Sequence, residues 1–327
     1  MTTQVLDLTN GTSSKPFRVL SLCTGIAGDV AAFECANVPH RMIAISESDP
    51  VASTALAQKF PDTPNLGDLT QVTHWRTYHG RTDILIAGIP CQPFSIAGRH
   101  RGHSDKRDLT PETLDIICEV EPRWVVIENV PQFATAKGGT DFRKFERRLK
   151  QAGYAIGHRV FEAAEVLPQR RKRLFVLAHR GGSQSTPSRI LADAARGGRR
   201  VEQGGEVSLP SGGASAGRTS VLHPPRLGTL MASASGLNRA GMRGHELDLL
   251  IVQEFPDIGL VVRRPTPLEA LRSQGFPDNW LDGIETEGRP LTDLEKYRLI
   301  GNSWPVPIAA SILSGIAKFD GFTISST

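Results

Sequence analysis

The fold of this chain is decided by the stretch Asp83-Ile84-Leu85-Ile86-Ala87-Gly88-Ile89-Pro90-Cys91-Gln92-Pro93-Phe94-Ser95. An apolar run that follows an aspartate and ends in Gly-x-Pro predicts a buried parallel strand over residues 83–87. The carboxyl ends of such strands form the edge at which open α/β sheets bind ligands. We therefore expect Cys91 on a loop at that edge, held in place by the flanking prolines. A thiol in this position is either a structural residue or a nucleophile.

Upstream, a strand and a glycine turn have the pattern of a ligand-binding loop. Residues 17–23 predict a strand, and the turn Thr24-Gly25-Ile26-Ala27-Gly28 precedes an apolar helix that extends to residue 36. A glycine turn at this position lets a ligand approach the backbone and the amino end of a helix. A further strand over residues 42–46 ends at Glu47. Its carboxylate is either solvated or placed to accept hydrogen bonds from ribose hydroxyls.

Two later segments place charged side chains at the ends of strands. Residues 123–127 predict a buried strand that ends at Glu128, and residues 174–178 predict another, which follows Gln169-Arg170-Arg171-Lys172-Arg173. Because side chains alternate along a strand, residues 169, 171 and 173 point to one side. Between residues 143 and 173, ten basic side chains stand against three acidic ones. This run is either a solvated face, as on the amphipathic helix predicted over residues 141–150, or a surface for a polyanion.

The segment after the cysteine loop is strongly polar. Residues 97–108 contain Gly, Arg and His and predict a mobile loop, which is either an ordinary surface loop or one that closes over a bound substrate. The helix that follows is predicted over residues 109–120, with Thr110 as its cap and Pro111 in the first turn.

In their order along the chain, these motifs resemble those of the DNA (cytosine-5)-methyltransferases, from about residue 18 to residue 319. The stretch Pro90-Cys91-Gln92-Pro93-Phe94-Ser95 is similar to the nucleophile motif of that family, and Gly301-Asn302-Ser303 to its closing cofactor motif. The resemblance implies an α/β fold: a Rossmann-like S-adenosylmethionine-dependent methyltransferase domain with a mostly parallel sheet, plus a small target-recognition domain. It implies methylation at C5 of a flipped cytosine in double-stranded DNA, through a covalent bond between Cys91 and C6 of the base.

The resemblance also implies roles for individual residues. The catalytic residues it implies are Cys91, Glu128, Arg171 and Arg173. The residues it implies for S-adenosylmethionine binding are Leu22, Cys23, Gly25, Ile26, Ala27, Gly28, Glu47, Ser48, Asp68, Leu69, Gly88, Pro90, Leu109, Asn302 and Ser303. Contacts to DNA are implied for Gln92, Ser95, Arg99, Asn129, Gln169 and Thr229. No metal site is expected, because the four cysteines form no C-x-x-C pair and no cluster with histidines.

Several positions depart from the pattern of the family. Where the family has Asp-Leu-Phe-x-Gly-x-Gly-Gly, this chain has Ser21, Cys23 and Ala27, and Cys23 replaces an aromatic side chain that lies against the cofactor. Ser48 stands where an aromatic over the adenine is frequent, and Trp304 replaces a small aliphatic residue. Three alternatives stay open: methylation of tRNA cytosine, transfer of a larger group, or a non-catalytic DNA-binding module with a degenerate cofactor site.

The expected organisation has four parts. Residues 1–16 form a flexible tail, residues 17–180 the catalytic domain, residues 181–290 the target-recognition domain, and residues 291–327 a C-terminal helix that returns to the catalytic domain. The Gly, Ser, Ala, Arg and Pro content of residues 181–226 is also typical of a linker.

Composition limits the class of protein. The chain has 327 residues, 39% of them hydrophobic and 22% charged, with a formal net charge of +4, and no apolar run is long enough to span a membrane. We expect a cytoplasmic monomer of a bacterial or phage-infected cell that does not associate with membranes. Its expected partners are double-stranded DNA and a cognate restriction endonuclease, with a role in restriction-modification, phage self-protection or orphan methylation.

Overall fold

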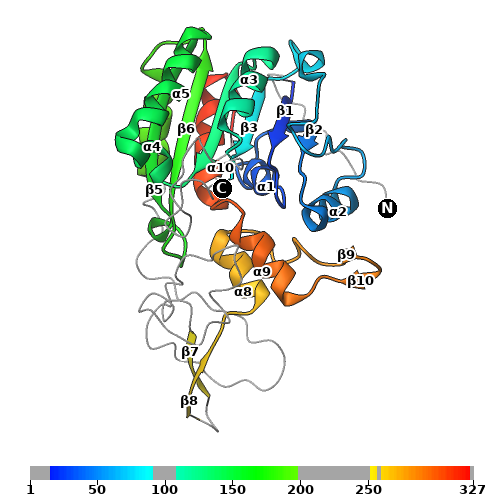
Figure 1. Ribbon diagram of the computed structural model, residues 1–327. Helices are drawn as coiled ribbons and strands as arrows, with labels where there is room; N and C mark the ends of the chain where they lie inside the picture. Colours follow the sequence, from blue (N-terminus) through cyan, green and yellow to red (C-terminus); the bar gives the residue numbers. More distant parts are fainter. Residues whose placement is uncertain (1–14, 91–107, 198–250, 256–258, 325–327) are drawn as a thin grey trace.

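The computed structural model describes residues 15–90, 108–197, 251–255 and 259–324 (Figure 1). Its centre is a six-stranded sheet of order β2-β1-β3-β4-β6-β5. The strands are β1 (Phe17–Leu22), β2 (His40–Ser46), β3 (Ile84–Gly88), β4 (Trp124–Asn129), β5 (Tyr154–Glu162) and β6 (Lys172–Arg180). All pairs from β2 to β4 are parallel, and β6 runs antiparallel to both of its neighbours. The sheet is therefore mixed but mostly parallel, as expected from the apolar strands.

The strand order reverses beside β1, which lies between β2 and β3. In open α/β sheets the loops that leave the two strands at such a point diverge to opposite faces, and ligands bind in the crevice between them. Here those loops are the glycine turn after β1 and the segment Gly88-Ile89-Pro90 after β3. Gly88 is paired in register with Glu128 on β4, so the predicted catalytic segments meet at one edge of the sheet.

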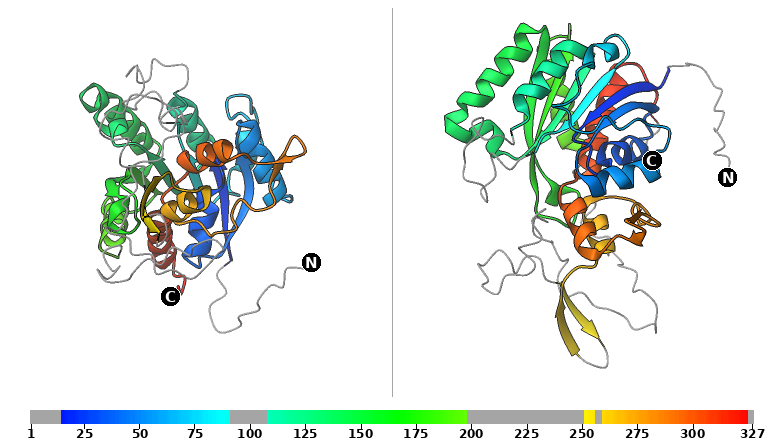
Figure 2. Two further views of the ribbon diagram at one scale, coloured as in Figure 1. Left: turned by 90° about the horizontal axis from the view of Figure 1, so that it is seen from below. Right: turned by 45° about the vertical axis from the view of Figure 1, so that its right-hand side comes forward.

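Helices cover both faces of the sheet (Figures 1 and 2). On one face lie α1 (Gly28–Cys35), α2 (Pro50–Lys59), α6 (Thr186–Gly197) and α10 (Val306–Phe319), which share a core with alternate strand residues such as Val19 and Ile86. On the other face α3 (Thr110–Val120) and α5 (Thr140–Gln151) pack on Leu20, Leu85 and Val125. The alternation of β1 and β3 side chains between the two cores follows from the two-residue period of a strand.

The part of the chain that forms the six-stranded sheet also contains four short helical elements: η1 (Trp75–Tyr78), α4 (Gln132–Thr135), η3 (Ala136–Gly139) and η4 (Ala163–Glu165). Below the sheet in Figure 1 lie α8 (Pro267–Gln274) and α9 (Asp293–Gly301), with the hairpins β7 (Ile251–Phe255)–β8 (Gly259–Arg263) and β9 (Glu285–Thr286)–β10 (Arg289–Pro290). The β7–β8 hairpin projects away from the sheet (Figure 2). Both α8 and α9 begin with capping boxes, in which Thr266 pairs with Glu269 and Thr292 with Glu295.

Some local expectations were wrong. Thr110 does not cap α3; its backbone N–H donates to the carboxylate of Asp108, while the N-cap position is occupied by Leu109. Residues 291–327 do not form one helix, because α9 ends at Gly301 and a turn separates it from α10. Strand β5 and helix α6 were not expected, and α6 is held by Ile190 and Leu191 in the core beside α10.

No single helix in the described segments is long and apolar enough to cross a membrane. The pair α9 and α10 meets the requirement of length and composition only when the two are taken together across a bend of 40°. Helix α10 buries eight of its side chains in the core on one face of the six-stranded sheet, among them Ile312 and Ile316.

Candidate active site

The loop after β1 has an unusual backbone. Cys23, Gly25 and Ala27 all have positive φ, at 52°, 58° and 60°. Glycine adopts this left-handed region freely, whereas a residue with a Cβ loses about 1–2 kcal/mol there. A Cβ at Gly25 would meet no atom within 4 Å, so that side of the loop is open. The loop is therefore a turn with an accessible backbone, and it carries strain at the two positions where the family pattern has an aromatic residue and a glycine.

Glu47 at the end of β2 fixes this loop. Its carboxylate accepts hydrogen bonds from the backbone N–H of Gly25 at 2.7 Å and of Asp49 at 2.8 Å. Burial raises the pKa of Glu47, and these two donors oppose the rise. The carboxylate thus supports the loop directly, and its remaining lone pairs are available to a ligand hydroxyl.

Further acidic groups surround the same loop. Burial raises the pKa of the Cys23 thiol, and the negative charges of Glu47 and Asp68 raise it further. The charges of two carboxylates from other loops therefore act on this thiol. Asp68 is exposed and accepts hydrogen bonds from the backbone N–H and the hydroxyl of Thr70. The pKa of Cys23 makes this residue a neutral thiol and a poor nucleophile.

A carboxyl group also lies beneath the loop. Ser21 occupies the position of the family aspartate and is buried, and its hydroxyl accepts a hydrogen bond from Thr24 at 3.0 Å. Asp29, in the first turn of α1, is 3% exposed and accepts a hydrogen bond from the backbone N–H of Val30. Burial raises the pKa of Asp29, and the Ser21 hydroxyl opposes the rise. The acid that is missing from position 21 therefore has a counterpart at position 29.

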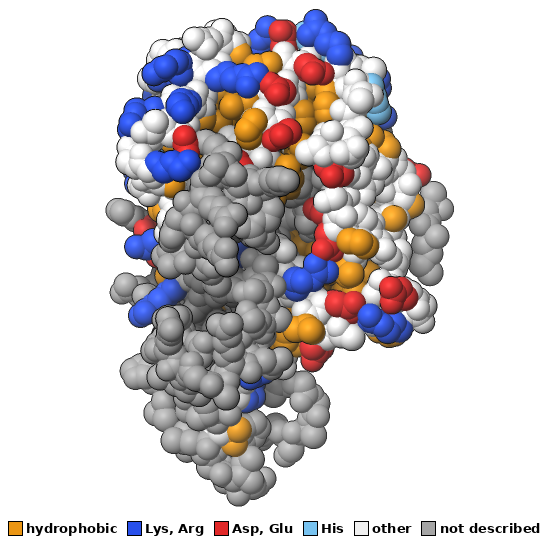
Figure 3. Space-filling view, in the orientation of Figure 1, with side chains coloured by type: hydrophobic (Ala, Val, Ile, Leu, Met, Phe, Trp, Pro, Cys, Tyr) orange, Lys and Arg blue, Asp and Glu red, His pale blue; other side chains and the backbone are white. Residues whose placement is uncertain are grey.

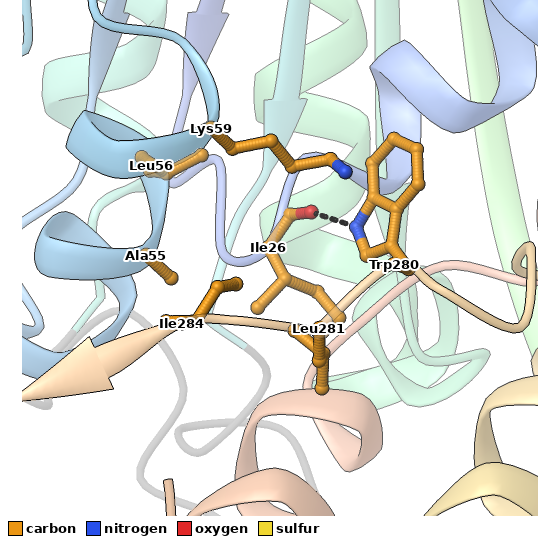
Figure 4. A pocket seen from close by; sticks show the side chains of 7 residues that line it. All are labelled: Ile26, Ala55, Leu56, Lys59, Trp280, Leu281 and Ile284. Carbon is orange, nitrogen blue, oxygen red and sulfur yellow. Dashed lines mark hydrogen bonds between the residues drawn. The ribbon is translucent and has the colours of Figure 1, made fainter. Parts of the chain in front are cut away.

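The loop is tied to a segment from the C-terminal third of the chain (Figure 4). The indole N–H of Trp280 donates to the carbonyl of Ile26 at 2.8 Å, and the Lys59 ammonium lies 3.8 Å from the centre of the Trp280 ring. Burial lowers the pKa of Lys59. Apolar side chains from α2 and the turn before β9 line the same shallow pocket, among them Leu56, Leu281 and Ile284. This contact was missed at the sequence level because no local pattern links residues 26 and 280.

Glu128 and Arg173 form an ion pair at the catalytic edge. They come from β4 and β6, and Arg173 Nε lies 2.8 Å from Glu128 Oε1. Glu128 is only 7% exposed. Burial raises its pKa, while the positive charges of Arg173 and Arg171 oppose the rise. Glu128 is therefore a carboxyl group that can hold a proton more readily than an exposed glutamate.

Arg171, one of the residues implied to be catalytic, is buried at the same edge. Its guanidinium is 1% exposed and donates to the backbone carbonyls of Gly301 at 3.0 Å and Ser303 at 2.6 Å. Its backbone N–H donates to Glu162 at 2.9 Å. Arg171 thus joins the strand region of the catalytic edge to the turn between α9 and α10. The expected alternation is confirmed here, because Gln169 and Arg171 are buried whereas Arg170 and Lys172 are exposed.

The turn after α9 reaches both predicted loops. The Ser303 hydroxyl is buried, has no hydrogen-bond partner among the described residues, and lies 2.7 Å from the position that a Cβ on Gly28 would take. The indole nitrogen of Trp304 lies 3.0 Å from the corresponding position on Gly88. Gly28 and Gly88 therefore allow this turn to approach the amino end of α1 and the end of β3. Asn302 is exposed at the end of α9.

The remaining predicted residues divide into two groups. Within the described residues, Leu22 and Leu69 are buried, Pro90 and Leu109 are half-buried, and Ser48 is exposed. Asn129 is buried and donates to the carbonyl of Ile89 at 3.4 Å, which links it to the segment that leads into Cys91. Outside the described residues lie Cys91, Gln92, Ser95, Arg99 and Thr229, together with residues 97–107 of the loop expected at 97–108.

The basic surface predicted around α5 is visible in Figure 3, where Lys and Arg side chains gather over α4 and α5 at the upper left. Phe142, Phe145 and Leu149 of α5 are buried, as expected, and its basic side chains are exposed. Some of these charges are neutralised locally, because Lys144 and Arg148 lie against acidic residues.

The described residues contain no group of three or more His, Cys, Asp or Glu side chains that could hold a metal ion. Cys23, Cys35 and Cys118 are free thiols.

Comparison with known proteins gives consistent matches. A family model described as C-5 cytosine-specific DNA methylase matches residues 17–203 and 249–318. The type II methyltransferase M.HaeII of Haemophilus aegyptius is 28% identical over 325 residues, which cover 91% of this chain and 92% of that protein. M.NgoBI of Neisseria gonorrhoeae, also a type II methyltransferase, is 30% identical over 313 residues, which cover 89% and 90%.

The solved structures give the same fold. The S. pombe Dnmt2 methyltransferase matches 94% of this chain and 100% of its own with a TM-score of 0.67, at 20% identity. The Entamoeba histolytica methyltransferase EhMeth matches 94% and 100% with a TM-score of 0.65, at 17% identity. These likenesses and the observed sheet confirm the predicted Rossmann-like α/β fold of a methyltransferase.

Proposed function

Because this chain belongs to the C-5 cytosine-specific DNA methylase family, we propose that it methylates C5 of a flipped cytosine at a specific site in double-stranded DNA. The observation that carries the proposal is the edge of the sheet at the ends of β3 and β4. There Gly88 is paired in strand register with Glu128, and Glu128 forms an ion pair with Arg173. Gly88 stands three residues before Cys91 and lies beside the glycine loop. One edge of the sheet thus provides a place for a donor and a place for a base.

We infer that the donor is S-adenosylmethionine, which supplies an electrophilic methyl group when bound. The residues present fit such a molecule. The open backbone at Gly25 and the Glu47 carboxylate suit the adenosine end, and the partnerless hydroxyl of Ser303 offers a donor at the other end. We propose the same cleft for the remaining cofactor residues named above, with Asp68 directed at the adenine amino group.

Cys91 is the proposed nucleophile. Addition of its thiolate to C6 of the base makes C5 electron-rich enough to accept a methyl group, after which loss of the C5 proton expels the thiolate and restores the double bond between C5 and C6. A cysteine needs a neighbouring positive charge to ionise at neutral pH. We infer that Arg173 and Arg171 contribute to a positive potential at this edge.

Glu128 and Arg173 would stabilise the attacked base. As the thiolate adds, negative charge develops toward N3 and O2 of the ring. A glutamate with a raised pKa can hold a proton at N3, and the guanidinium of Arg173 can donate to O2. Arg173 Nε lies 2.8 Å from Glu128 Oε1, so the two side chains are close enough to reach neighbouring atoms of one base. Gln169 and Asn129 would support this pocket, with Gln92, Ser95, Arg99 and Thr229 directed at the DNA.

The finer biological assignments are also proposals. We propose that residues 181–290 contribute to target recognition while α6 supports the catalytic sheet, so the functional boundary lies after residue 197. The relatives named above are type II methyltransferases, which supports a role with a cognate restriction endonuclease. We further propose that the enzyme acts as a monomer in the cytoplasm.

The test is transfer of labelled methyl from S-adenosylmethionine to unmethylated genomic DNA and, in parallel, to bulk tRNA, followed by nucleoside analysis. We expect label in 5-methylcytosine of DNA, with base-resolution sequencing giving the recognition site. The matched control is Cys91→Ser, which should abolish turnover and leave DNA binding within about threefold. Label in tRNA alone would overturn the choice of substrate, and near-normal transfer by Cys91→Ser would overturn the covalent mechanism.

A further inference from the structure

A row of basic side chains runs along the exposed side of α5. Arg143, Arg147 and Lys150 are all exposed, and their spacing of four and three residues places them on one side of the helix. We call these three residues the α5 ridge, which extends over about 10 Å of the helix axis. Duplex DNA carries one phosphate per about 3.4 Å on each strand, so the ridge is long enough to meet about three phosphates.

The basic residues beside the ridge are neutralised within the protein. Lys137 and Lys144 both lie against Asp141, at 3.2 Å and 3.9 Å. Arg148 forms an ion pair with Asp115 of α3. The side of α5 that faces α3 therefore has its charges balanced.

The ridge itself lacks such compensation. Within the described residues, Arg147 and Lys150 have no acidic partner. Arg143 donates to two neutral oxygens, the carbonyl of Gly138 at 2.8 Å and the hydroxyl of Thr140 at 3.1 Å. Like charges four residues apart repel each other, and the amino end of a helix, near Arg143, favours acidic side chains. The stability of α5 thus does not account for the ridge.

The positive charge of the whole chain is concentrated around this helix. Residues 137–172 contain ten Lys and Arg side chains and four Asp and Glu, whereas the formal net charge of all 327 residues is +4. The remaining residues therefore carry a net negative charge. The exposed Lys172 of β6 is next in sequence to Arg173, which pairs with Glu128 at the catalytic edge. Lys and Arg side chains also continue below α4 on the same side of the molecule (Figure 3), so the basic surface extends from α5 toward that edge.

We propose that the α5 ridge binds backbone phosphates of the DNA duplex that flanks the target base. This inference rests on the proposed function, since it takes double-stranded DNA as the substrate. The ridge adds affinity without sequence preference, because the phosphates are the same at every site, and this affinity falls steeply with salt. The ridge lies outside the pocket for the base, so it acts on DNA binding and leaves the chemical step unchanged.

The experiment measures the salt dependence of DNA binding by fluorescence anisotropy, with full-length protein and a labelled, unmethylated duplex at about 50–200 mM salt. The variant Arg143→Gln/Arg147→Gln/Lys150→Gln should reduce the slope of log Kd against log salt by about 2–3, since each phosphate contact contributes about 0.9. Arg147→Gln alone, at an exposed position with no acidic partner in the described residues, should reduce the slope by about 0.9.

The matched control is Arg41→Gln/Arg81→Gln/Lys318→Gln, which removes the same net charge from exposed positions on β2, before β3 and on α10. Its slope should change by less than about 1, because these positions are away from α5. Thermal unfolding of both triple variants should match that of the wild type. Equal slopes for the two triple variants would overturn the proposal.

Methyl-transfer kinetics separate this inference from the proposed function. The ridge variant should keep kcat within about twofold of the wild type and raise the KM for DNA at least about tenfold, the signature of lost ground-state binding. Normal methylation by the wild type, with a ridge variant that behaves like the control, would overturn this inference alone. A wild type that makes no 5-methylcytosine, with a slope that still depends on the ridge, would overturn the proposed function alone. An effect of the ridge on binding of bulk tRNA and none on duplex DNA would overturn the choice of partner.

Discussion

Replacement of Arg171 by methionine tests whether the catalytic edge depends on its connection to the turn after α9. Methionine has a similar length and no donor, so the change removes the hydrogen bonds to the carbonyls of Gly301 and Ser303. A hydrogen bond from a charged donor is worth about 1.5–3 kcal/mol. Part of this loss is offset, because a buried guanidinium no longer has to be desolvated. We therefore expect a net loss of about 2–4 kcal/mol in the free energy of unfolding.

The assays are thermal unfolding and cofactor binding. For a chain of 327 residues, a loss of 1 kcal/mol in the free energy of unfolding lowers Tm by about 1.5 °C, so Arg171→Met should lower it by about 3–6 °C. The released turn should also weaken S-adenosylmethionine binding at least tenfold, or about 1.4 kcal/mol. The control is Lys172→Ala, which alters the exposed neighbour. If Arg171→Met has the same Tm and Kd as this control, the idea that Arg171 positions residues 301–303 is wrong.

Two further changes test the loop strain and the buried acid. Ala27→Gly should leave stability nearly unchanged, because relief of about 1–2 kcal/mol of left-handed strain offsets the lost methyl group and the added freedom of the unfolded chain. Ala32→Gly, in the regular part of α1, should lower the free energy of unfolding in urea by about 1–2 kcal/mol more than Ala27→Gly does. Equal losses would argue against strain at Ala27. Burial raises the pKa of Glu128 above its ordinary 4.5, so its contribution to stability is present below that pH and is lost as pH rises through the folded pKa. Glu128→Gln should therefore weaken the decline of stability with rising pH above 4.5 and reduce methyl transfer by about 10²–10⁴-fold; an unchanged pH profile of unfolding would contradict the raised pKa.

Local patterns were sufficient for the framework of the site. The apolar strand before Gly88 and the glycine turn after β1 involve residues that are close in sequence, and both lie where expected. The alternation from Gln169 to Lys172 followed from strand geometry alone. The position of Glu128 at the end of a buried strand was likewise evident from its neighbours.

The burial of the site residues and the pairing of their charges could be known only from the structure. The pair between Glu128 and Arg173 depends on β6 inserting between β4 and β5, a strand order that the sequence does not encode locally. The raised pKa of Glu128 follows from that burial. The strain at Cys23 and Ala27 also appears only in the backbone angles.

The sequence by itself thus determined the family, the type of sheet and the residues that end its strands, because these depend on short stretches whose periodicity and turns are local. Tertiary structure alone decided that Trp280 holds the loop at Ile26, that Arg171 holds the turn at residue 303, and that Trp304 packs on Phe175. Residues 26 and 280 are separated by 254 positions, and no periodic pattern extends over such a distance. These contacts form only when packing of the helices on the sheet brings the C-terminal third of the chain onto the loop after β1.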